Sequence, residues 1–116
     1  MTSNSPLYKN AANAIKEYCG DGMIYMFRYN LTVDDVFSYS VCGLCNDKIC
    51  FAGESGIVSE IPTEKIADVS YVQYVGCAAI ECLVDGELTE LCRTDMKNAL
   101  AMQSASKQLK AICEGK

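Results

Sequence analysis

Four of the eight cysteines in this sequence stand in two close pairs, the arrangement with the most obvious capacity for chemistry. Cys42 and Cys45 form a CxxC motif, and Cys77 and Cys82 form a second pair with four residues between its members. Two cysteine pairs are typical of tetrahedral zinc sites, and a CxxC at the start of a helix is typical of thiol–disulfide exchange proteins. A cysteine-based metal-binding or redox protein is therefore the alternative function that we keep.

The positions of these pairs favour a structural interpretation. Residues 42 and 45 lie an odd number of positions apart in a predicted strand, so their side chains point to opposite faces. Cys77 and Cys82 also lie inside a predicted strand. We therefore interpret the cysteines as small core residues that stay reduced, and we expect neither a metal nor another cofactor.

The sequence contains no histidine. This removes the usual general base, the common partner of a catalytic serine or cysteine, and the commonest metal ligand. Glu81 and Glu90 fall opposite each other in a predicted hairpin, and we interpret them as repelling charges on a solvated face. The loop at residues 53–56 has glycines at both ends but lacks the lysine and helix of a phosphate-binding loop. We predict that the protein is not an enzyme.

Aromatic side chains supply the candidate interface. Tyr25, Phe27 and Tyr29 alternate along one face of a predicted strand, and Tyr71 and Tyr74 lie in another. Alternating aromatic residues in sheets more often line the core or pair across strands. If residues 23–29 form an edge strand, however, their aromatic side chains make a docking strip for a second chain, and we take these five residues as interface candidates.

The balance of charge argues against several classes of partner. Fifteen acidic residues oppose ten basic ones, which gives a net charge of −5. Nucleic-acid binders and proteins that bind anionic membranes normally present a basic face, so we expect neither partner here. The sequence shows no signal peptide and no apolar run of about 20 residues that could cross a membrane. We therefore expect a cytoplasmic protein.

The length and the pattern of residues predict a single domain over residues 1–116. Ser5 and Pro6 predict the start of a helix over 6–19, and Thr94 or Asp95 caps an amphipathic helix over 95–113. The turn Asp85-Gly86 predicts a two-residue hairpin that pairs Ile80 with Leu91, Glu81 with Glu90, and Leu83 with Leu88. A further turn is predicted at residues 33–35. The predicted strands are 23–29, 36–44, 48–52, 57–61, 65–75, 77–84 and 87–92.

Two segments add a resemblance to this pattern. The run from Phe37 to Phe51 is an apolar strand, a tight turn and a second strand, in which Leu44, Asn46 and Ile49 match a "Leu-Thr-Asn-x-Arg-Leu" turn. The run from 60 to 69 is similar to "Glu-Ile-Pro-Leu-x-x-Ile-x-x-Val". In this order, and followed by a hairpin and a helix, these motifs resemble the pleckstrin-homology-like superfold in its bacterial PH-domain and GRAM-like versions. Cys45 and Lys48 depart from the motif.

The resemblance implies a mainly β fold with α (α+β) over residues 23–113. About seven antiparallel strands form two packed sheets capped by the C-terminal helix, and the N-terminal helix lies outside the pattern. A competing architecture with αβα layers needs a helix near residues 53–65, and Pro62 with Gly53 and Gly56 argues against it.

The resemblance also implies a binding or scaffold module. Members that bind phosphoinositides use lysine and arginine in the loop after the first strand, whereas residues 30–35 here contain no basic residue and two acidic ones. We therefore expect no phosphoinositide or membrane binding. The expected role is protein–protein contact, with either a protein partner or a second copy of the chain.

Overall fold

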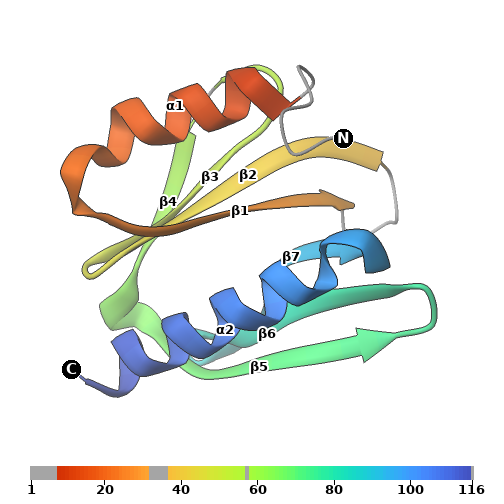
Figure 1. Cartoon of the computed structure of the whole chain (residues 1–116). Helices are drawn as coiled ribbons and strands as arrows, with labels where there is room; N and C mark the ends of the chain where they lie inside the picture. The colour runs from red at the N-terminus through yellow and green to blue at the C-terminus, as the bar shows by residue number, and fades with distance from the viewer. Residues whose placement is uncertain (1–7, 32–36, 57, 116) are drawn as a thin grey trace.

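The computed structural model describes residues 8–31, 37–56 and 58–115. Over these ranges the chain forms seven strands and two α-helices (Figure 1). The elements are α1 (Lys9–Cys19), β1 (Met23–Leu31), β2 (Phe37–Cys45), β3 (Lys48–Ala52), β4 (Val58–Pro62), β5 (Ile66–Tyr74), β6 (Cys77–Val84), β7 (Glu87–Asp95) and α2 (Ala99–Glu114), with 3₁₀ turns at Gly20–Gly22, Thr63–Lys65 and Met96–Asn98. The predicted α+β class, with seven antiparallel strands and a helix at each end, is confirmed. The Ser5-Pro6 helix start and the turn at 33–35 lie outside the described residues.

The strands form one antiparallel sheet in the order β4-β3-β2-β1-β7-β6-β5. The expectation of two separate sheets is therefore wrong. In the described residues β1 and β7 pair at Leu31 and Arg93, and this contact makes the two groups of strands continuous. The sheet curls around α2, which packs against β1 on one side and against β5 and β6 on the other (Figure 1).

The strand order also corrects the expected position of β1. This strand has β2 on one side and β7 on the other, so it lies inside the sheet, and the edges are β4 and β5. The alternation of aromatic residues in β1 indicates which side chains share a face, but it carries no information on which strands lie beside it. The expectation of an edge strand at residues 23–29 is wrong.

The two faces of the sheet bury two different cores. The inner core lies between the curled sheet and α2. The outer core lies between α1 and the opposite face of β2 and β3. Successive residues of β2 and β3 alternate between these cores, which explains why both strands read as nearly continuous apolar runs. The inner core includes Phe27, Leu44, Ile49, Ile80, Met102 and Leu109, and the outer core includes Tyr8, Ala11, Ile15, Val41, Cys50 and Ala52.

A glycine in β2 allows α1 to approach the sheet. A Cβ atom at Gly43 would lie 2.7 Å from Cγ2 of Ile15 and 3.1 Å from Sδ of Met23. Both distances are shorter than a van der Waals contact between such atoms, so a residue with a side chain would push the helix away. Gly43 therefore fixes how closely α1 packs.

One set of polar contacts ties the two halves of the sheet together, and another anchors the turn that links β4 to β5. Asn30 is 3% exposed, and its Oδ1 accepts hydrogen bonds from the Thr94 hydroxyl (3.1 Å) and the backbone N–H of Asp95 (2.9 Å). At the other end Thr63 is fully buried and donates its hydroxyl to the carbonyl oxygen of Asn46 at 2.8 Å. Thr63 belongs to a three-residue 3₁₀ turn. This turn is the helical structure present in the described part of residues 53–65, where the alternative with αβα layers needs a helix.

The C-terminal hairpin follows the predicted register with one shift. Glu81 pairs with Glu90 and Leu83 with Leu88, as predicted, but Ile80 pairs with Cys92 because the ladder is irregular between Ile80 and Glu81. The side chain of Asp95 accepts a hydrogen bond from the N–H of Lys97 and begins a 3₁₀ turn, so α2 starts at Ala99. Met96, near the start of the helix predicted over 95–113, therefore lies in this turn and is 44% exposed.

The Asn30 contacts predict a clear loss of stability. We expect Asn30→Ala to lower the free energy of unfolding by about 1–3 kcal/mol, because two buried donors lose their acceptor. Asn13→Ala, at an exposed position of α1, is the matched control and should change stability by no more than about 0.5 kcal/mol. Urea denaturation measures both variants, and an equal effect of the two substitutions would contradict this role of Asn30.

The position of Gly43 leads to a second matched pair. We expect Gly43→Ala to destabilise the protein by roughly 1–3 kcal/mol, because the added methyl group overlaps Ile15. At Gly53 the nearest atom to an added Cβ is the Ser40 hydroxyl at 3.8 Å, so Gly53→Ala should be nearly neutral. Thermal unfolding followed by circular dichroism compares them, and a neutral Gly43→Ala would show that α1 does not need this close approach.

Candidate functional site

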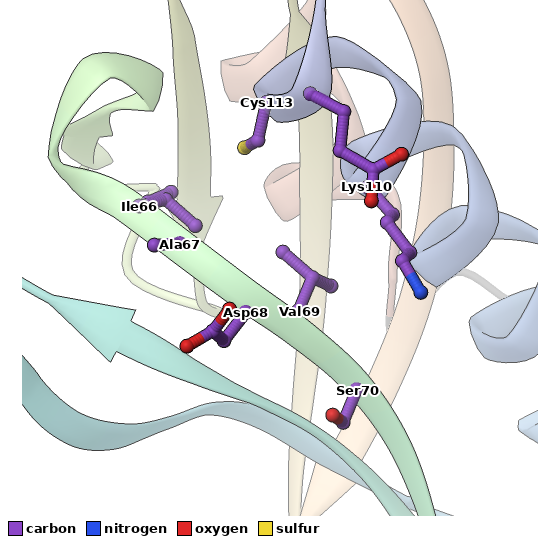
Figure 2. A pocket seen from close by; sticks show the side chains of 8 residues that line it. Ile66, Ala67, Asp68, Val69, Ser70, Lys110 and Cys113 are labelled. Carbon is purple, nitrogen blue, oxygen red and sulfur yellow. The ribbon is translucent and has the colours of Figure 1, made fainter.

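A cleft separates the first half of β5 from the C-terminal end of α2 (Figure 2). Its volume is about 350 Å³, at the lower end of the range for sites that hold small molecules or side chains. The residues that line it are Ile66, Ala67, Asp68, Val69 and Ser70 from β5, and Lys110, Cys113 and Glu114 from α2.

A bulge in β5 shapes this cleft. Asp68 has a φ of 53°, in the left-handed region that aspartate tolerates better than most residues, and the pairing of β5 with β6 is interrupted between Ala67 and Ser70. In a regular strand, residues three positions apart point to opposite faces. Here Ile66 and Val69 are both buried, at 5% and 6% exposure, and Val69 lies on the α2 side of the strand (Figure 2). The bulge therefore gives the cleft an apolar floor.

The rim of the cleft is charged. Lys110 and Glu114 of α2 are exposed beside the cleft, whereas the carboxylate of Asp68, which is also exposed, points away from α2 (Figure 2). The thiol of Cys113 points toward Thr63 and donates to its carbonyl oxygen at 3.9 Å. The cleft thus has an apolar floor with one carboxylate and one ammonium group on its α2 side, a combination that favours a ligand with an apolar part and a charged group.

The outer edge of β5 offers backbone hydrogen-bonding groups beside the cleft. β5 is the last strand of the sheet in the described residues. The two-residue turn after β5 makes Tyr74 and Cys77 a pair whose backbone groups hydrogen-bond to each other. In an antiparallel ladder such pairs alternate with pairs whose backbone groups point away from each other. Tyr71 and Gln73 fall in the alternate positions. Their backbone N–H and C=O groups therefore point outward to the open edge.

The aromatic residues of β1 do not form an exposed strip. Phe27 is 3% exposed, and Tyr25 and Tyr29 pack against the inner core. The rings of Tyr25 and Phe27 stack at 6.2 Å, and the Tyr25 hydroxyl donates to the carbonyl oxygen of Ala101 in α2 at 3.5 Å. Burial raises the pKa of Tyr29. The face that we expected to dock a partner is covered by α2 of the same chain.

The two aromatic candidates in β5 occupy different faces. Tyr71 is partly buried against the inner core. Tyr74 is 42% exposed, and its hydroxyl donates to the carboxylate of Glu81, which raises the pKa of Tyr74. The guanidinium of Arg93 lies 5.2 Å from the Tyr74 ring centre. Tyr74 is therefore the interface candidate that lies both on the surface and beside the open edge.

The two carboxylates expected to repel each other, of Glu81 and Glu90, each have a partner of their own. Arg93 donates to both carboxylate oxygens of Glu90, at 3.1 and 2.8 Å, and the side chains of Arg93 and Glu90 are only 16% and 13% exposed. Glu81 accepts from Tyr74. Each carboxylate therefore has a hydrogen-bonding partner on the same face of the sheet.

The four cysteines of the two sequence motifs do not meet. Cys42 and Cys82 lie in the inner core, Cys45 lies on the opposite face of β2, and Cys77 lies 4.0 Å from Nη1 of Arg93. The described residues include all eight cysteines, and all are free. No group of three or more cysteine, aspartate or glutamate side chains in that part of the chain is arranged to hold a metal ion.

Sequence reasoning missed the bulge and therefore the cleft. The available signal was Asp68, a poor strand former in the middle of a β-rich run.

No helix in the described ranges is both long and apolar enough to cross a membrane. No family model, no curated protein and no solved structure matches this chain at a significant level.

The buried thiols predict a loss of stability in alkaline solution. Burial raises the pKa of Cys82 to about 11, above the value of about 8.5 in an unfolded chain. The folded state therefore holds its proton more tightly, so the contribution to stability is complete below pH 8 and is lost as the pH rises toward 11.

Urea midpoints at pH 7 and pH 10 measure this effect. We expect the wild-type protein to lose stability between these values, and Cys82→Ala to lose about 1 kcal/mol less because it lacks one titrating thiol. Cys113→Ala removes a partly exposed thiol that also contributes to the raised pKa of Cys82, so it should fall between the wild type and Cys82→Ala. Identical pH dependence in all three proteins would contradict the assigned role of burial.

Proposed function

We propose that this chain is a non-enzymatic binding module of pleckstrin-homology-like architecture, and that it binds an extended segment of a partner protein along the edge of β5. The observation that carries the proposal is the open edge at Tyr71 and Gln73, which continues directly from the cleft at Ile66–Ser70. A strand added to such an edge gains affinity from main-chain hydrogen bonds and specificity from the adjacent pocket.

Three features support the pleckstrin-homology-like part of the proposal. The seven strands follow one another as antiparallel neighbours within β1–β4 and within β5–β7. The join between these groups is narrow, at Leu31 and Arg93, and α2 packs where the curled halves face each other. The remaining element, α1, lies on the outer face and is an addition to that pattern.

The other edge of the sheet is less suited to strand addition. β4 has five residues and ends at Pro62, whereas β5 has nine. Glu60 in β4 is also bound by the hydroxyl of Tyr18 in α1. Short edge strands with proline and charged residues are a common protection against pairing with other chains. The longer β5 edge is therefore the better binding surface.

Charge favours a heterologous partner over a second copy. Two copies of a chain with a net charge of −5 repel each other. The cleft has the carboxylate of Glu114 and the ammonium of Lys110 on its α2 side, and the exposed carboxylate of Asp68 lies on the edge strand itself. We propose that the bound segment carries lysine or arginine next to an apolar residue, with the apolar side chain against Val69 and the cation near Asp68 or Glu114. The same charges disfavour phosphoinositides, anionic membranes and nucleic acids.

A proline scan of the edge tests the proposal. A peptide selected from a displayed random library of about 12 residues serves as the probe, and its affinity is measured for two variants at one position. We expect Gln73→Pro to weaken binding by about tenfold or more, because proline removes the outward N–H. Gln73→Ala keeps this N–H and should bind like the wild type. Proline is tolerated at an edge position whose N–H faces solvent, so both variants should fold.

Amide chemical shifts of the labelled protein locate the bound peptide. Perturbations along β5 and the C-terminal end of α2 support the proposal. Equal binding by Gln73→Pro and Gln73→Ala, or perturbations confined to other strands, would overturn it. A stable dimer in size exclusion that Gln73→Pro converts to monomer would identify a second copy as the occupant and contradict the heterologous partner.

A further inference from the structure

Three cysteines from different elements meet where α1 ends against the sheet. We name Cys19, Cys45 and Cys50 the thiol cluster. Cys50 pairs with Gly43 across β2 and β3, and Cys45 follows Gly43 by two residues on the same face. A Cβ atom placed on Gly43 would lie 3.5 Å from Sγ of Cys19. The absence of a side chain at Gly43 thus leaves the space into which the Cys19 thiol projects.

The members of this cluster lie close together, and burial and the neighbouring Cys19 thiol both raise the pKa of the other two. The Cys19 thiol interacts with the side chains of both Cys45 and Cys50. In the part of the chain that the structure describes, no such group is arranged to hold a metal ion. The chemistry open to neighbouring thiols of this kind is therefore thiol–disulfide exchange.

Access to the cluster is unequal. Cys50 is completely buried and Cys45 is 4% exposed, whereas Cys19 is partly exposed at the end of α1. Burial raises the pKa of Cys45 to about 11 and that of Cys50 to about 12. A reagent from solution therefore reaches Cys19 first, and the two sheet thiols can only react with a group that Cys19 already carries.

The path of the chain selects Cys45 as the second thiol. Gly20–Gly22 lead from Cys19 to Met23, and Met23 is the residue that pairs with Cys45. Cys50 lies on β3, opposite Gly43, and no such short chain link joins it to Cys19. A disulfide needs the two sulfur atoms at about 2.05 Å, so Cys19 must shift toward the sheet. Gly20 has a φ of 58°, and no atom lies within 4 Å of the Cβ positions of Gly20 and Gly22, which leaves room for this shift.

We propose that Cys19 and Cys45 are a redox modification site that takes up a small disulfide of the glutathione class and becomes an intramolecular disulfide. The Cys19 thiolate attacks one sulfur of the reagent, whose S–S bond breaks, and one thiolate leaves. Cys45 then gives its proton to water and attacks Sγ of Cys19, which expels the second thiolate. The two protein thiols are oxidised, and the small disulfide is reduced to two thiols.

The product bond would lock α1 onto the sheet. In the reduced protein the end of this helix is held by the Tyr18 hydroxyl on Glu60, by Lys48 at 5.0 Å from the Tyr18 ring centre, and by the packing of Ile15. The contacts of Tyr18 are at the surface, and Ile15 lies one helical turn before Cys19. A covalent link at Cys19 would replace them with a fixed anchor and leave the cleft between β5 and α2 unchanged, because α1 packs on β2, β3 and β4.

Mass mapping of the oxidised protein tests the site. Reduced wild-type protein is incubated with oxidised glutathione, its remaining thiols are alkylated, and its peptides are identified. We expect a Cys19–Cys45 bridge in the wild type and in Cys50→Ser, and an arrested Cys19–glutathione adduct in Cys45→Ser. Backbone amides of α1 should exchange with solvent slower by roughly tenfold or more in the bridged form.

Four results would overturn the proposal: an unmodified Cys19, a glutathione adduct that persists in the wild type, a bridge from Cys19 to Cys50, or unchanged exchange rates in α1. The peptide map of the oxidised wild-type protein tests the proposal even if a serine variant fails to fold. Peptide binding at β5 is measured separately, so a failure of the thiol site and a failure of the proposed function are distinguishable.

Discussion

The buried amide of Asn30 closes the fold, and most of the structure depends on this closure. In the described residues the two groups of strands share one residue pair, Leu31 with Arg93, which would be a weak hinge by itself. At the same corner Oδ1 of Asn30 accepts hydrogen bonds from both Thr94 and Asp95. Because these groups are removed from water, each one without a partner would cost more than a surface hydrogen bond contributes. The corner is therefore held in one arrangement.

This closure determines where the candidate site lies. It keeps β1 opposite β5, so α2 is packed from both sides by one curled sheet. Leu109 and Met102 fill the space between the halves, and the C-terminal end of α2 is left beside the bulge of β5. The cleft exists because the helix and the bulged strand diverge there, while the same sheet leaves β5 without a further neighbour in the described residues.

The two faces of the sheet give the molecule two chemically different regions. The inner face holds the core that supports β5 and the proposed binding edge. The outer face holds α1 over Gly43, where helix and strand approach closely enough to bring Cys19 to the sheet thiols. Since the outer core contributes no side chain to the cleft, chemistry at the thiol cluster and binding at β5 are separable properties of one domain.

Local sequence features determined the helices and strands, but they determined little about which of these elements lie next to each other. The period-two runs, the Asp85-Gly86 turn and the amphipathic C-terminal segment predicted the strands, the hairpin pairs Glu81–Glu90 and Leu83–Leu88, and the last helix, because these depend on backbone preferences and on contacts between residues close in sequence. The same patterns placed Tyr25, Phe27 and Tyr29 correctly on one face. They wrongly placed that strand at the edge of the sheet. Its second neighbour is set by the pairing of Leu31 with Arg93, which joins segments far apart in the chain. Only the tertiary structure decided that one sheet forms in place of two, that Arg93 neutralises Glu90, and that a bulge at Asp68 opens a cleft beside α2. Each of these depends on which distant groups desolvate one another, and the spacing of residues along a chain does not contain that information.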